Sequence, residues 1–81
     1  MPRVTLFGRA GCCLCDEARK ALQDVAATHP FELVEVDVAS DPGLNARYGE
    51  RIPVLAIDGD EAFEYRVDPD GLRDLLDRVA S

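Results

Sequence analysis

Three cysteines fall within four consecutive positions, between a strand-like run and a helix-like segment. Cys12, Cys13 and Cys15 follow the apolar run Val4–Phe7, and apolar residues at helical spacing come after them. If Cys12 lies at the first turn of that helix, Cys15 lies about one turn further on, close enough to form a disulfide with it. The chain is therefore expected to fold so that a strand leads these two thiols to the start of a helix.

A helix start favours the charged form of a thiol. Free backbone N–H groups and the positive end of the helix dipole stabilise a thiolate on the first cysteine, Cys12. Asp16 and the net negative charge of the chain act against that thiolate. Because a thiolate attacks disulfides and a neutral thiol does not, the pattern favours Cys12 as a nucleophile and Cys15 as the thiol that resolves the mixed disulfide.

The size and charge of the chain argue against several classes of function. Its 81 residues make one domain, residues 1–81. The net charge of −7, from 16 acidic against 9 basic residues, argues against nucleic acid and anionic membrane surfaces as partners. No apolar stretch approaches membrane-spanning length and no signal peptide precedes the first strand, so we expect a cytoplasmic protein. In that reducing compartment, clustered cysteines indicate a transient redox pair or a metal site rather than a structural disulfide.

Periodicity along the rest of the chain predicts strands that alternate with helices. Expected strands are Arg3–Phe7, Phe31–Val38, Ile52–Ile57 and Glu61–Val67. Expected helices run from Cys13 to about Ala27, from the Ser40–Pro42 start to Gly49, and from Asp68–Asp70 to about Val79. A turn signal at Asp58–Asp60 joins the last two strands as a hairpin. The order β-α-β-α-β-β-α predicts an α/β fold, in which a parallel βαβ half and an antiparallel hairpin form one mixed four-stranded sheet flanked by helices.

These motifs and this order resemble the thioredoxin fold. The chain is similar to small bacterial glutaredoxin-like proteins whose site reads Gly-Cys-x-Leu-Cys-Asp/Glu, here Gly11–Asp16. A second matching motif is Ile52–Val54, which reads Ile-Pro-Val and begins the third strand. In the family this proline is cis and stands beside the cysteine pair. The resemblance covers nearly the whole chain.

The resemblance implies roles for particular residues. Cys12 matches the family's nucleophile and Cys15 its resolving cysteine. Pro53 matches the cis-proline, and the backbone of Ile52 is implied to pair with an extended substrate or with glutathione. Arg9, three residues before Cys12, falls where glutaredoxins often carry a basic residue that meets a glutathione carboxylate.

The chain departs from the family pattern at three places. Arg66–Gly71 has no paired glycines where glutaredoxins often carry a Gly-Gly-x-Asp run that binds glutathione. Arg51 stands where many have threonine. Arg51 and Arg9 either favour the Cys12 thiolate and receive an anionic substrate, or they are ordinary solvated charges. Cys13 stands where the family has proline or histidine. It is either a plain substitution that faces solvent or a thiol that modulates the pair or replaces Cys15 as the resolving thiol.

We therefore expect a monomeric thiol–disulfide oxidoreductase. The Cys12/Cys15 dithiol reduces disulfides in proteins or small molecules. Glutathione, another low-molecular-weight thiol or a thiol reductase then reduces the oxidised pair. No bound cofactor and no metal are expected, because zinc needs four ligands and the chain offers one cysteine cluster and a distant His29.

Two other classes of function stay open at this point. The first is a non-catalytic thioredoxin-fold module that docks an extended peptide beside Pro53. The second is a carrier that shares an iron–sulfur cluster between two chains, as some glutaredoxins do.

Overall fold

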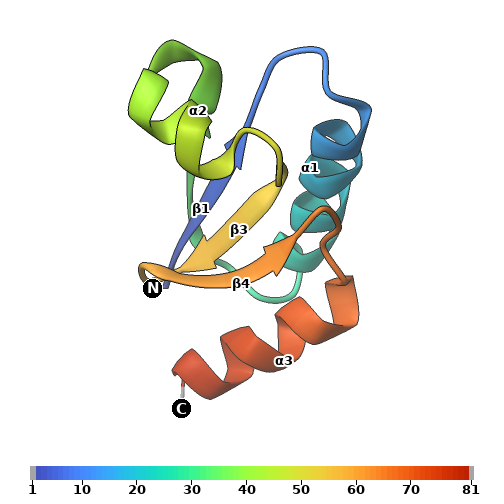
Figure 1. Cartoon of the computed structure of the whole chain (residues 1–81). Helices are drawn as coiled ribbons and strands as arrows, with labels where there is room; N and C mark the ends of the chain where they lie inside the picture. Colours follow the sequence, from blue (N-terminus) through green and yellow to red (C-terminus); the bar gives the residue numbers. More distant parts are fainter. Residues whose placement is uncertain (1, 81) are drawn as a thin grey trace.

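The computed structural model describes residues 2–80 and arranges them as a sheet between two layers of helices (Figure 1). Its elements are β1 (Arg3–Gly8), α1 (Cys13–Ala26), β2 (Glu32–Asp37), the 3-10 turn η1 (Val38–Ser40), α2 (Pro42–Tyr48), β3 (Val54–Ile57), β4 (Asp60–Glu64) and α3 (Pro69–Ala80). The sheet order is β2-β1-β3-β4, with β1 parallel to β2 and antiparallel to β3, and with β3 antiparallel to β4. The predicted α/β fold and its mixed four-stranded sheet are confirmed.

Alternate side chains of the central strands supply a separate core on each face of the sheet. The larger core, beneath α1 and α3, consists of Val4, Leu6, Ala18, Leu22, Val25, Leu55, Ile57, Leu72 and Leu76. The smaller core, beneath α2, holds Val38, Tyr48 and Val54, and the Phe7 ring stacks on Tyr48 with centroids 4.3 Å apart. Figure 1 shows α2 on one side of the sheet and α1 and α3 on the other. The larger core fixes the helix that carries the cysteines.

The second helix begins and ends where its sequence signals lie. Asp41 caps its start, since the Asp41 carboxylate accepts hydrogen bonds from the N–H groups of Gly43 and Leu44. Pro42 follows at the first helical position, where its missing N–H costs nothing. Gly49 is the C-cap, and its N–H donates to Asn45 O. This short helix packs Tyr48 against the sheet beside the segment that leads to Pro53.

The predicted ends of three strands are wrong. The second strand was predicted over Phe31–Val38 and spans Glu32–Asp37, because Val38 begins η1. The third was predicted from Ile52 and starts at Val54, after a proline that has no N–H to donate to the ladder. The first strand extends one residue beyond its prediction, to Gly8.

The fourth strand differs most from its prediction, Glu61–Val67. It spans Asp60–Glu64, and a register shift between Leu55 and Ala56 of β3 interrupts its pairing. Tyr65 has a φ of 67°, in the left-handed region, so the chain turns there instead of continuing the strand. A regular pleat would place Phe63 and Tyr65 on one face. Instead, Phe63 packs against the larger core and Tyr65 is 48% exposed.

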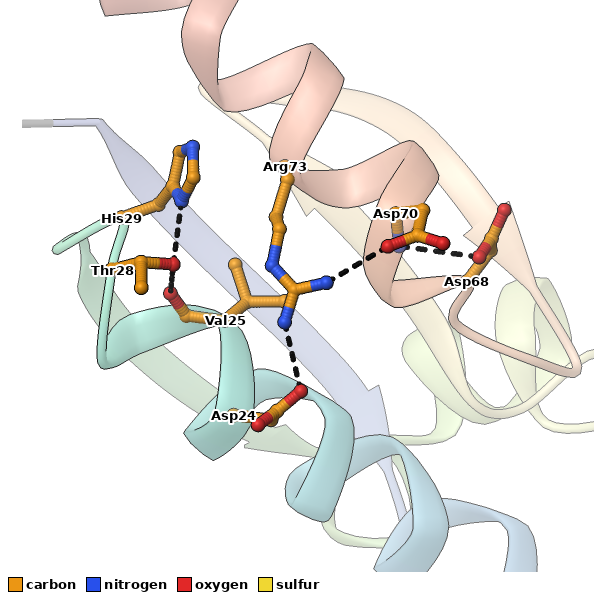
Figure 2. A network of polar contacts seen from close by, with 7 residues as sticks. All are labelled: Asp24, Val25, Thr28, His29, Asp68, Asp70 and Arg73. Carbon is orange, nitrogen blue, oxygen red and sulfur yellow. Dashed lines mark hydrogen bonds and ion pairs between the residues drawn. The ribbon is translucent and has the colours of Figure 1, made fainter.

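Polar contacts hold α3 against α1 at the end of α1 away from the cysteines (Figure 2). The Arg73 guanidinium donates to Asp24 Oδ2 at 2.8 Å and to Asp70 Oδ1 at 2.9 Å. His29 Nε2 lies 2.9 Å from Asp77 Oδ1, so the single histidine links the loop after α1 to α3. No helix within residues 2–80 has the length and apolar character needed to cross a membrane.

Candidate active site

Cys12 is the N-cap residue of α1, the position predicted for the nucleophile. Its backbone is extended, with φ −84° and ψ 118°, and its Sγ accepts a hydrogen bond from the Cys15 N–H at 3.4 Å. A hydrogen bond with the Cys15 thiol, followed by backbone hydrogen bonds from Cys15 and Leu14, lowers the pKa of Cys12. Burial and the charge of Asp16 act in the opposite direction. The thiolate is favoured because the first turn of the helix supplies donors to this sulfur.

Cys15 lies below Cys12, fully buried at the inner side of the helix. Burial raises the pKa of Cys15, and so does the hydrogen bond that its thiol gives to Cys12. The Arg9 N–H and the charge of Arg19 lower that pKa. The two thiols therefore differ: the outer sulfur ionises first, and the inner sulfur keeps its proton and donates it to the outer one.

Gly8, at the end of β1, leaves the space that Cys15 occupies. A Cβ at position 8 would lie 2.9 Å from Cys15 Sγ, closer than side-chain carbons approach other atoms. The inner thiol is thus packed directly against the strand that precedes the cysteine loop. Nothing in the sequence near Gly8 indicates that a sulfur packs against it.

We expect Gly8→Ala to destabilise the protein by about 1–3 kcal/mol, the usual cost of forcing an extra methyl into a packed site. In a Cys15→Ala background, where the clashing sulfur is gone, the same substitution should cost clearly less. Urea unfolding of the four proteins in this double-mutant cycle gives the coupling energy. Equal costs in both backgrounds would show that Gly8 does not hold the space for the thiol.

Cys13 differs from both neighbours in that its side chain is exposed. The three cysteines are free thiols. The prediction that Cys13 faces solvent is confirmed. Within residues 2–80 no group of three or more histidine, cysteine or acidic side chains is arranged to hold a metal ion.

The Ile52–Pro53 segment connects α2 to β3. Its peptide bond is cis, and Pro53 is fully buried. The Pro53 carbonyl accepts a hydrogen bond from the Tyr65 N–H at 2.8 Å, which ties the segment to the end of β4. The backbone of Ile52 makes no hydrogen bond within residues 2–80.

The two arginines predicted to flank the cysteines have different surroundings. The Arg9 guanidinium donates to Asn45 Oδ1 of α2 at 3.1 Å, which links the cysteine loop to that helix. Arg51 forms ion pairs with Glu61 at 3.2 Å and Glu64 at 3.1 Å. The structure therefore joins Arg51 to β4 rather than to the cysteine pair, among the residues that it describes.

Sequence reasoning missed one charged residue near the cysteines. Arg19, one turn after Asp16 on α1, pairs with Asp16 at 2.8 Å and with Glu35 of β2 at 2.5 Å. The spacing of Asp16 and Arg19, three residues apart on a helix, was a signal that could have revealed this pair. No local signal could have revealed Glu35, which reaches Arg19 from another strand.

The sheet order and the cis-proline segment that follows the paired cysteines define a class, the thioredoxin-fold proteins of thiol-redox type. A family model described as Glutaredoxin-like domain (DUF836) matches residues 3–77. The chain belongs to this glutaredoxin-like family.

Relatives and solved structures agree with this assignment. An uncharacterized protein of Mycobacterium bovis is 38% identical over 77 residues, which cover 89% of this chain and 79% of the relative. An X-ray structure of a protein from X. campestris is 36% identical, with a TM-score of 0.78, and the match covers 93% of this chain and 96% of that one. A solution structure of a Nitrosomonas europaea protein is 28% identical, with a TM-score of 0.80 and coverage of 91% and 89%. A thioredoxin from Halobacterium salinarum, 24% identical with a TM-score of 0.72, shares the fold; its match covers 99% of this chain and 75% of that one.

Proposed function

We propose that this protein is a thiol–disulfide oxidoreductase that reduces disulfides through Cys12 and Cys15. One observation carries the proposal: the helix start holds an outer thiol whose pKa is lowered directly above a buried thiol whose pKa is raised. A nucleophile must be a thiolate when substrate arrives, and a resolving thiol must stay protonated until the mixed disulfide has formed. The lowered pKa of Cys12 and the raised pKa of Cys15 support these two roles.

The reaction proceeds by two exchanges. The Cys12 thiolate attacks one sulfur of a substrate disulfide, a Cys12–substrate disulfide forms, and the other substrate sulfur leaves as a thiolate that takes up a proton. Cys15 then loses its proton and its sulfur attacks Cys12 Sγ. The Cys12–Cys15 disulfide forms and the second substrate sulfur leaves, so that two electrons have passed to the substrate.

Regeneration needs an external reductant. Two molecules of glutathione or another low-molecular-weight thiol, oxidised to their disulfide, restore the dithiol; a thiol reductase is the other source of the two electrons. The protein acts as a monomer in the cytoplasm, with no bound cofactor. We assign Cys13 no step in this reaction.

We infer that an extended substrate binds on the surface beside the cysteines. A hollow of about 230 Å³ is lined by Leu14, Glu17, Ala18, Tyr65, Arg66 and Val67. The exposed Tyr65 ring gives this hollow an apolar side. The backbone of Ile52, which makes no hydrogen bond among residues 2–80, offers strand-like hydrogen bonds to a substrate chain. Arg9 supplies positive charge for an anionic substrate in an otherwise acidic protein, whereas Glu61 and Glu64 bind the guanidinium of Arg51.

The same Ile52 backbone and exposed Tyr65 would also suit a non-catalytic module that docks an extended peptide. The chemistry of the cysteines separates the two functions. A docking module needs no reversible disulfide and no lowered thiol pKa.

Equilibration in graded thiol/disulfide buffers, followed by trapping of free thiols and mass spectrometry, tests the proposal. We expect a single two-electron transition between Cys12 and Cys15 in the cytosolic range, roughly −200 to −320 mV. The Cys13→Ser variant should show the same transition, which excludes the middle thiol from the bond. Failure of Cys12 and Cys15 to form a disulfide would leave the docking module as the better account.

A further inference from the structure

A carboxylate stands beside the cysteine pair, where it works against the proposed reaction. Asp16 follows Cys15 directly in the first turn of α1, and its charge opposes ionisation of Cys12. Carboxylates are common at this end of a helix because the dipole favours them. Here the same position brings a negative charge close to a sulfur that must also become negative.

The carboxylate of Asp16 is held by a guanidinium. Arg19 Nη1 donates to Asp16 Oδ1 at 2.8 Å, and Arg19 Nε donates to Glu35 Oε1 at 2.5 Å. The side chain of Arg19 is 36% exposed and that of Asp16 is 64% exposed, so solvent screens much of the attraction between them. Glu35 lies opposite Leu6 in the β1–β2 register, so it anchors the other side of Arg19 to the sheet. The first turn of α1 is thereby tied to the edge strand through one side chain.

Arg19 also lies along the cysteine loop. A hollow of about 200 Å³ has Arg19, Glu35 and Asp37 in its lining together with Gly8 and with Arg9 of the cysteine loop. Gly8 contacts the Cys15 sulfur, and the Arg9 N–H bonds to it. The charge of Arg19 favours the thiolate of Cys15. Arg19 thus affects both thiols: it acts on Cys12 through Asp16, and its own charge acts on Cys15.

We propose that Arg19 is a positioning residue for the cysteine pair: it holds and neutralises the Asp16 carboxylate, so that Cys12 ionises beside an ion pair instead of a free negative charge. This inference rests on the proposed function, for which it names the residue that adjusts the two thiols. Glu35 fixes the direction of the guanidinium. Besides the two thiols themselves, the charged side chains that act on the sulfurs are Asp16 and Arg19 on α1. Glu35 and Asp37 of β2 line the hollow.

The chain contains a matched guanidinium away from the cysteines. Arg73 is bracketed in the same way, by Asp70 three residues earlier on its own helix and by Asp24 of a second element (Figure 2). Both arginines therefore join two elements through two carboxylates, and only Arg19 lies at the cysteine loop. Arg73→Gln controls for the loss of such a brace as a purely structural event.

The test is the pKa of Cys12 in the reduced protein, measured by thiolate absorbance in a Cys13→Ser background. We expect Arg19→Gln to raise this pKa by about 0.5 unit, about a threefold fall in thiolate below the pKa, because water largely screens a charge at this exposed position. Asp16→Asn should lower the pKa. In the D16N background Arg19→Gln should leave it unchanged, because no carboxylate remains for Arg19 to hold. Arg19→Lys, which keeps the charge, should recover most of the shift.

Two results would overturn the proposal. One is a Cys12 pKa that Arg19→Gln does not change, or changes equally with and without Asp16. The other is an equal shift in Arg73→Gln, which would make the effect a general loosening. Thermal melts of both glutamine variants measure that loosening separately. Because the titration needs no turnover, a shifted pKa in a protein without disulfide reductase activity would refute the proposed function and leave the role of Arg19 intact.

Discussion

Loss of turnover to the uncatalysed rate is the expected result of Cys12→Ser. Serine keeps the size and the hydrogen-bonding position of the side chain, so the helix start is preserved, but a hydroxyl neither ionises at neutral pH nor joins a disulfide. Without a thiolate at this cap position no mixed disulfide forms. Reduction of a small aromatic disulfide, followed by the absorbance of the released thiol, measures the effect. Retained turnover would refute Cys12 as the nucleophile.

The matched variant is Cys15→Ser, which leaves the first exchange intact. It should accumulate the Cys12–substrate disulfide, visible by mass spectrometry as an added half of the substrate. The rate of that first exchange should rise with pH as Cys12 loses its proton. Since the pKa of Cys12 is lowered, the rate should be half-maximal at a pH below the ordinary thiol pKa of about 8.5. A half-maximal rate at or above that pH would show that the helix start does not activate the sulfur.

The largest loss of stability is expected for Leu72→Ala. Leu72 is fully buried in the larger core, where α3 packs against the sheet and α1. Truncating a buried leucine to alanine costs about 2–5 kcal/mol, from lost transfer free energy and the cavity left behind. Small domains are stable by only about 5–15 kcal/mol. The change should therefore lower the melting temperature by more than about 10 °C.

Val79→Ala, on the same helix, is the control for this substitution. Val79 is 45% exposed, so its truncation should change the free energy of unfolding by less than about 0.5 kcal/mol. Thermal and urea unfolding of both variants give the comparison. Similar losses in the two variants would mean that α3 is not held by the buried contacts of Leu72.

The order of elements could be predicted from the sequence because each signal was local. The apolar stripe of α3 has helical spacing, and Asp41 with Pro42 marks the start of α2. The ends of the strands depended on contacts between distant residues. Tyr65 ends β4 because its N–H bonds to the Pro53 carbonyl, twelve positions away, and adopts a φ that favours glycine. No local pattern at Tyr65 indicates that turn.

In the candidate site, too, local features could be predicted from the sequence and contacts between distant residues could not. Cys12 and Cys15 could be placed at a helix start because their spacing and the strand before them are local features. The groups that set the properties of the sulfurs come from elsewhere in the fold. Gly8 limits the space around Cys15 from β1, and Glu35 orients Arg19 from β2. The charge of Arg51 was expected near the cysteines, but two acids on β4 bind it.

Because the two cores differ in size, the two helical layers should also differ in how readily they open. The layer of α1 and α3 rests on the larger core, and α2 rests on three buried residues and their neighbours. A layer with fewer buried contacts opens locally at a lower free energy than the whole protein unfolds. Amide exchange should therefore be faster in α2 than in β1. A molecule that approaches Cys12 therefore meets a stable surface on the side of α1. On the other side, where Asn45 of α2 bonds Arg9, we expect it to meet a surface that opens locally more often.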